Sequence, residues 1–255
     1  MRRKAVLATL GLALAWCAVG RPAAAQPQPE VFELVTADSV RIAAFWYARS
    51  NDETAPVALL LHNPGSRHEH WNSLITPLYR AGFQILAPDL RGHGQSKELA
   101  PDVYAEMRRR NRQPYLDMIH DVEAAIAWLT QKQEVPPERI AVVGGEHCAN
   151  LTIQAFSRNP DLGAGIAMSP AKNYFNAPLL EWAEGYGNRP LYIIIPKQYL
   201  GRGASDIAEV MRDNPGFKMK VFPVADLHGV RMLGLSWNVE TLIVDWLTEV
   251  FGLES

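Results

Sequence analysis

Three side chains of this sequence have types and spacing suited to nucleophilic chemistry: those of Glu146, Cys148 and His228. Glu146 and Cys148 follow the apolar run 140–143 and two glycines, a pattern that predicts a buried strand, a tight turn and the start of a helix. A carboxylate or a thiolate at such a turn can attack an electrophilic carbon when a histidine assists it. His228 precedes Gly229 in a later part of the sequence.

An alternation of strands and helices must position these candidates. After a hairpin at 31–48, strands are predicted at 57–62, 83–89, 139–144, 164–170, 190–196 and 218–224, and helices at 71–82, 115–131, 148–158, 177–186, 204–213 and 237–251. A polar loop is expected at 90–101. This order predicts an open, mostly parallel sheet with helices on both faces. The carboxyl ends of its strands share one edge, where ligands bind in such sheets.

Motifs in this order resemble the α/β-hydrolase superfamily, and within it the small esterase-like and dienelactone-hydrolase-like members. The resemblance lies in "LLLHNPGSRHEHWNSLITPLYRAGFQILAPDLRGHGQS" (59–96), in "DVEAAIAWL" followed by "VPPERIAVVG", and in "HGVRML" (228–233). It implies an α/β-hydrolase fold with a mostly parallel sheet of about eight strands and an N-terminal antiparallel hairpin. Helices would cover both faces, and no substantial lid domain is expected.

The resemblance also fixes a register for the tight turn. Members read G-x-S-x-G, with the nucleophilic serine at the apex of a strained strand-to-helix turn. Laid against "GGEHCANL", Gly144 takes the first glycine, Glu146 the serine and Cys148 the second glycine. A competing register makes Cys148 the nucleophile, but its flanking residues Glu146 and Asn150 are large for the close approach of strand and helix.

The resemblance places His228 at the triad histidine, with an acid expected just after strand 190–196. Lys197, Gln198 and Tyr199 stand there instead, so the triad acid is missing. A carboxylate normally holds the histidine tautomer and stabilises the imidazolium, and its loss weakens the histidine as a base.

The remaining parts of such a site are backbone groups. The implied oxyanion-hole donors are the N–H groups of Asn63 and His147, whereas Pro64 has no N–H to donate. The pair His68 and His70 shows no evident third ligand, so we expect no metal and no cofactor.

The N-terminus predicts a secretory signal peptide at residues 1–25. A basic start at 2–4 and an apolar stretch at 5–20 precede small residues that allow cleavage after Ala25. A retained membrane anchor is the alternative reading. Cleavage would remove Cys17 and leave Cys148 without a disulfide partner.

Charge restricts the partners of the mature chain. Cleavage leaves 21 basic and 27 acidic residues, a net charge of −6, which does not suggest nucleic-acid binding. The run "RRRNR" at 108–112 is interpreted as an exposed helix end. We expect no stable membrane insertion after signal cleavage.

We therefore expect a secreted or periplasmic protein with a single α/β-hydrolase domain at 26–255. Its ancestry is ester-hydrolase-like, and with glutamate at the elbow and no triad acid it would lack serine-hydrolase activity. Such a protein would bind a small-molecule ligand or a protein partner at the old pocket. The alternative is an active hydrolase on small ester-, epoxide- or halide-type substrates, using Glu146 or Cys148 with His228.

Overall fold

The computed structural model describes residues 27–49, 52, 54–223 and 226–253. The expected signal peptide, residues 1–25, lies outside these residues and stays a prediction. No helix within the described ranges has the length and apolar character needed to cross a membrane.

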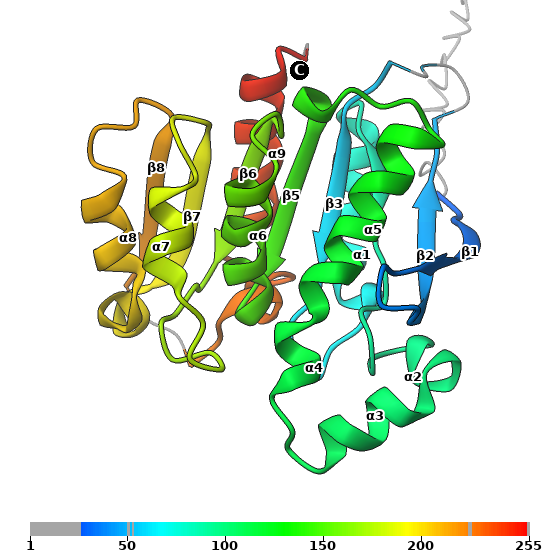
Figure 1. Cartoon of the computed structure of the whole chain (residues 1–255). Coiled ribbons are helices and arrows are strands. Elements are labelled where there is room, and N and C mark those ends of the chain that lie inside the picture. The colour runs from blue at the N-terminus through cyan, green and yellow to red at the C-terminus, as the bar shows by residue number, and fades with distance from the viewer. Residues whose placement is uncertain (1–26, 50–51, 53, 224–225, 254–255) are drawn as a thin grey trace, which may run out of the picture.

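One eight-stranded sheet runs through the described part of the chain (Figure 1). Its strands are β1 Glu30–Val35, β2 Arg41–Tyr47, β3 Val57–Leu61, β4 Gln84–Leu86, β5 Ile140–Gly145, β6 Ala164–Met168, β7 Leu191–Pro196 and β8 Phe217–Phe222. Their spatial order is β1-β2-β4-β3-β5-β6-β7-β8. β1 and β2 pair antiparallel, β2 pairs antiparallel with β4, and the strands from β3 to β8 are parallel. The expected sheet and its N-terminal hairpin are confirmed.

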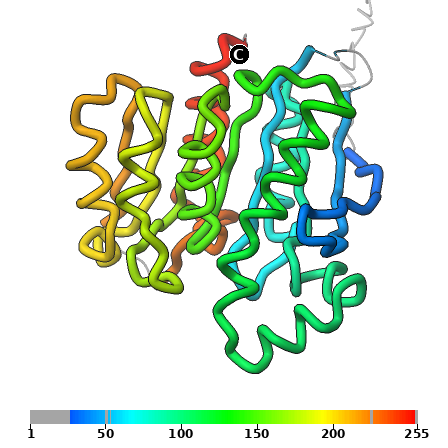
Figure 2. Tube along the Cα trace, in the orientation of Figure 1, coloured from blue at the N-terminus to red at the C-terminus, as the bar shows by residue number. Residues whose placement is uncertain are grey.

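Helices cover both faces of this sheet (Figures 1 and 2). One face carries α1 Asn72–Arg80 and α9 Val239–Phe251, and the other carries α5 Met118–Gln131, α6 His147–Arg158, α7 Leu179–Glu184 and α8 Ala204–Val210. Loops that follow the parallel strands meet at the lower edge of the sheet in Figure 1. The elements thus gather the candidate residues after β3 and β5 at one edge.

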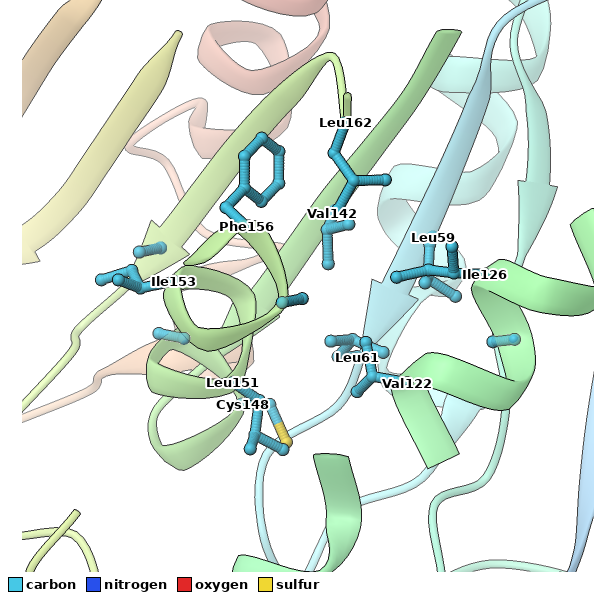
Figure 3. Packing of buried hydrophobic residues seen from close by; sticks show 14 of the residues in the cluster. Leu59, Leu61, Val122, Ile126, Val142, Cys148, Leu151, Ile153, Phe156 and Leu162 are labelled. Carbon is cyan, nitrogen blue, oxygen red and sulfur yellow. The ribbon is translucent and has the colours of Figure 1, made fainter. Parts of the chain in front are cut away.

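The central strands are buried on both sides, and their side chains alternate between two cores. Leu59 and Leu61 point toward Val122 and Ile126 of α5, as Figure 3 shows, whereas Leu60 belongs to the core under α1 and α9. Full burial of a side chain of this size stabilises the fold by about 1.5–3 kcal/mol relative to exposure. These cores hold the strand ends, and therefore the site, in place.

The region at 90–101 differs from expectation. It contains the helix α2 Ser96–Leu99 and the first residue of α3 Pro101–Arg108, so the expected polar loop is wrong from Ser96 onward. The Ser96 hydroxyl donates to the Asp89 carbonyl and accepts the Ala43 N–H at 2.9 Å, and these distant partners anchor α2. The helix expected at 115–131 is likewise divided into α4 Gln113–Leu116 and α5. These insertions are short, and for the described part of the chain the expectation of no substantial lid domain is confirmed.

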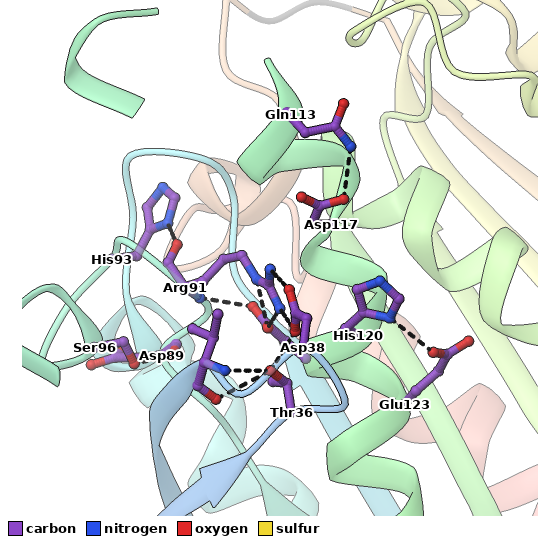
Figure 4. A network of polar contacts seen from close by, with 12 residues as sticks. Thr36, Asp38, Asp89, Arg91, His93, Ser96, Gln113, Asp117, His120 and Glu123 are labelled. Atoms are coloured by element: carbon purple, nitrogen blue, oxygen red, sulfur yellow. Dashed lines mark hydrogen bonds and ion pairs between the residues drawn. The ribbon is translucent and has the colours of Figure 1, made fainter. Parts of the chain in front are cut away.

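An ion-pair network that is buried at Arg91 and Asp121 and exposed at Asp38 fixes the loop that leads into α2 (Figure 4). Arg91 Nη1 and Nη2 donate to the Asp38 carboxylate at 2.6 and 2.9 Å, and Arg91 Nε donates to Asp121 Oδ1 at 2.8 Å. Burial raises the pKa of Asp121 to about 6, although Arg91 opposes that rise. The hydrogen bonds from Arg91 hold the pKa of Asp38 well below its usual range. This network positions a loop and leaves no free group for chemistry.

Candidate active site

Glu146 lies at the apex of a strained turn between β5 and α6. Its backbone has φ 55° and ψ −120°, a conformation that non-glycine residues rarely adopt. A Cβ atom added to Gly144 would lie 2.1 Å from the Cys148 carbonyl oxygen, and one added to Gly145 would lie 2.0 Å from Asn63 Oδ1. Only glycines fit before the apex, because strand and helix approach closely there. We call residues 145–147 the elbow.

The Glu146 carboxylate contacts two polar side chains. Asn63 Nδ2 donates to Glu146 Oε1 at 2.5 Å, and His228 Nε2 lies 3.2 Å from the same oxygen. The Glu146 and His228 side chains are only 13% and 22% exposed. Burial raises the pKa of Glu146, while Arg231 and the Asn63 amide oppose the rise. The structure therefore brings Glu146 and His228 together as a half-buried carboxylate–imidazole pair.

The Asn63 side chain links the elbow to the histidine loop. Its Oδ1 accepts the Val230 N–H at 3.0 Å, while its Nδ2 donates to Glu146. A Cβ added to Gly229, which has φ 57°, would lie 2.4 Å from Asn63 Oδ1. Sequence reasoning assigned Asn63 only a backbone role and missed this side-chain contact. The one available signal was an amide side chain directly after the strand that ends near the elbow.

His228 presents its two nitrogens to different surroundings. Nε2 faces Glu146, and Nδ1 is buried with no hydrogen-bond partner among the described residues. Burial lowers the pKa of His228, and Arg231 and Arg202 lower it further, while the backbone of Asp226 opposes this fall. The Nε2 nitrogen, which takes the proton of the nucleophile in a catalytic triad, here faces the Glu146 carboxylate.

The expected place of the triad acid is occupied by the 3₁₀ helix η3 Lys197–Arg202. The Tyr199 ring packs on the His228 ring with a centroid distance of 4.7 Å, and the Arg202 guanidinium lies 4.4 Å from the Tyr199 centroid. Asp206, the next acid along the chain, lies in α8 and pairs with Lys172 at 2.8 Å. The structure thus sets an aromatic ring and a cation near His228 where a triad would have a carboxylate.

Cys148 lies in the first turn of α6 and is fully buried. Its sulfur packs in the core with Leu61 and Leu151 (Figure 3). Burial raises the pKa of the Cys148 thiol well above its usual value, and the nearby Glu146 raises it further. A thiol in these surroundings stays protonated at neutral pH and does not supply a thiolate nucleophile.

The two candidate oxyanion donors are the backbone N–H groups of Asn63, after β3, and of His147, the last residue of the elbow. Among the described residues, no hydrogen bond occupies the backbone N–H of Asn63 or of His147. The His147 ring is fixed because its Nε2 donates to the Tyr115 carbonyl at 2.7 Å. Burial lowers the pKa of His147 to about 4, so its ring is neutral at physiological pH.

The structure groups three possible metal-ligating side chains away from the elbow. His68 Nδ1 lies 3.0 Å from Asp89 Oδ1 and 3.3 Å from Glu69 Oε2, while His70 is not part of this group. Asp89 already accepts the backbone N–H groups of His68 and Gln95, each at 2.8 Å. These contacts indicate that Asp89 stabilises its own loop.

Comparison with known proteins agrees with this geometry. The family model described as "alpha/beta hydrolase fold" matches residues 57–189. A curated relative, the magnesium-chelatase 30 kDa subunit of Rhodobacter capsulatus, is 27% identical over 148 residues, which are 53% of this chain and 49% of that protein. The chain therefore matches about half the length of that relative.

Solved structures share the fold at low identity. An esterase of Pyrococcus furiosus has a TM-score of 0.68 and 19% identity, with 87% of this chain and 92% of that chain covered. A dienelactone hydrolase of Anabaena variabilis has a TM-score of 0.64 and 15% identity, with 90% of this chain and 100% of that chain covered. The strained elbow, the parallel sheet and the family match over more than half of its length together show that this chain belongs to the alpha/beta hydrolase fold family.

Proposed function

We propose that this protein is an exported, non-catalytic member of its family that binds a small-molecule ligand or a protein partner at the elbow. The observation that carries the proposal is the contact of His228 Nε2 with Glu146 Oε1 at 3.2 Å. In an ester hydrolase that nitrogen takes the proton of the nucleophile, and here it faces a carboxylate that has no such proton to give when ionised. Export rests on the predicted signal peptide, and would place the protein in the periplasm or outside the cell.

The histidine also lacks the support that base catalysis needs. Its Nδ1 has no hydrogen-bond partner among the described residues, and Tyr199, in the stretch where a triad acid is expected, packs its ring on the His228 ring. An acid-to-amide change at this point in a triad costs about ten-thousandfold in rate. The arrangement therefore favours a histidine that holds Glu146 over one that activates a substrate.

The charge at the elbow opposes ester chemistry as well. Attack on an ester builds negative charge on the carbonyl oxygen, which the Asn63 and His147 N–H groups would have to stabilise. The ionised Glu146 carboxylate, at the elbow itself, would repel such a second negative charge.

One observation favours a second candidate function, a hydrolase in which Glu146 is the nucleophile. Asn63 Nδ2 orients Glu146 Oε1, and His228 lies close enough to activate water against an ester formed on Glu146. Small esters, epoxides or haloalkanes would be its substrates. A missing partner at Nδ1 weakens this route for the same reason as above.

Restoring the lost groups tests the proposal. Glu146→Ser should gain weak turnover of p-nitrophenyl acetate, and adding Tyr199→Asp should raise it more than additively, because both changes act on one unit. Glu146→Ser with His228→Ala is the matched control and should lose the gain. The wild type should show no turnover that depends on His228. A wild-type rate that falls on His228→Ala would overturn the proposal.

A further inference from the structure

A cavity of about 150 Å³ lies outside the elbow and is lined in part by residues of α2 and α3. Its side-chain lining is His93, Lys97, Tyr104, Met107, Arg108 and Tyr115, and we call it the cap cavity. We propose that the cap cavity binds a small ligand with a single aromatic ring and an anionic group. This is a second site beyond the proposed function, because Glu146, Asn63 and His228 do not line it.

Two cations without ion-pair partners supply the anion preference. Lys97 and Arg108 make no salt bridge within the described residues, and the Lys97 ammonium lies 5.2 Å from the Tyr104 ring centroid. The acids of α3, Asp102 and Glu106, line a different hollow on the far side of that helix. One side of α3 therefore carries positive charge without an ion-pair partner among the described residues, in a chain that is acidic overall, and this favours an anionic ligand.

The remaining walls favour a flat apolar body. Tyr104 and Tyr115 offer rings, and the Tyr115 ring is held by stacking on Phe175 at 4.3 Å. The Met107 sulfur packs so closely on Gly92 that an added Cβ would lie 2.2 Å from it, which fixes α3 over the cavity. A cavity of about 150 Å³ is large enough for one benzene-sized ring. Aromatic walls beside a cation pair therefore fit an aryl carboxylate or an aryl phosphate.

The cap cavity lies close to the elbow without being part of it. Tyr115 lines the cavity, and its carbonyl accepts the ring Nε2–H of His147. Figure 1 shows α2 and α3 below the carboxyl edge of the sheet, where α4 leads back into α5. A ligand in the cap cavity would thus sit beside the start of α6.

Binding is tested on the full mature chain by titration calorimetry at low salt, with benzoate and phenyl phosphate as anionic probes and benzyl alcohol as the uncharged match. Both anions should bind, and benzyl alcohol should bind at least about tenfold more weakly. Lys97→Gln and Arg108→Gln should each weaken anion binding about tenfold, as expected for loss of one charged hydrogen bond. Tighter binding of phenyl phosphate than of benzoate would assign the anionic group as phosphate, and the reverse as carboxylate.

Arg109→Gln is the matched control, since Arg109 is exposed and adjacent but does not line the cavity. It should leave the affinity unchanged. An equal loss for Arg109→Gln, equal binding of benzyl alcohol, or no binding of either anion would overturn the inference. Loss of binding on Glu146→Gln but not on Lys97→Gln would place the ligand at the elbow, which refutes the cap cavity and leaves the proposed function standing.

Discussion

A comparison of Glu146→Ala with Glu146→Gly should reveal the backbone strain in the elbow. Glu146 has φ 55° and ψ −120°, which glycine adopts freely and an L-residue with a Cβ does not. Glu146→Ala and Glu146→Gly both lose the bond from Asn63 and the contact with His228. The difference between the two variants therefore isolates the backbone conformation.

Backbone strain of this kind costs about 1–3 kcal/mol for a residue with a Cβ. The greater conformational entropy of the unfolded chain lowers the stability of a glycine variant by about 0.4–1 kcal/mol relative to an alanine variant. Glu146→Gly should consequently be more stable than Glu146→Ala by about 0.5–2 kcal/mol. For a chain of this size, each kcal/mol corresponds to roughly 2–4 °C in Tm.

Thermal and urea unfolding of the two variants would measure this difference. Ala127→Gly is the control, because Ala127 is half-buried within α5 and its change to glycine should destabilise by about 1 kcal/mol. We expect glycine to be more stable than alanine at position 146 and less stable than alanine at position 127. If glycine is no more stable than alanine at 146, the apex lies elsewhere and the assignment of Glu146 to the elbow is refuted.

Two further predictions concern groups at the same turn. Glu146→Gln should raise Tm at neutral pH and lose that advantage below about pH 4, because burial raises the pKa of Glu146. A carboxyl group with a raised pKa in the folded state contributes its full stability below the unfolded pKa of about 4.3. That stability is lost as the pH rises through the folded pKa, where the buried group ionises. A gain that grows toward acid would contradict this sign. Cys148 should resist an aromatic disulfide reagent in the native state and react on unfolding, because its thiol is fully buried with a raised pKa; rapid native labelling would show that the turn opens.

The sheet and the larger helices were predictable because their signals are local. Val57–Leu61 is uniformly apolar, as a strand buried on both faces must be, and α5 repeats its apolar residues at helical spacing. The helix α2 was not predictable in this way, since Ser96 is anchored by partners at Asp89 and Ala43. Contacts between residues so far apart in the chain give no signal in the local sequence.

The candidate site shows the same division. Glu146 and His228 could be assigned by register against a known motif, without a structure. The Asn63 amide could not, because its bond to Glu146 joins residues 83 positions apart and its bond to Val230 joins residues 167 positions apart. Side-chain direction at the end of β3 decides both bonds, and the pattern of apolar and polar residues does not specify it.

The most direct test of a non-catalytic elbow is intact-mass analysis with peptide mapping after incubation with a fluorophosphonate, an activated ester, an epoxide and a haloalkane. A serine hydrolase of the same fold serves as the positive control. We expect no covalent adduct on the wild-type protein and no burst of product at pH 7–8. An adduct on Glu146 that accumulates in His228→Ala and turns over in the wild type would contradict it and identify an active hydrolase with a glutamate nucleophile.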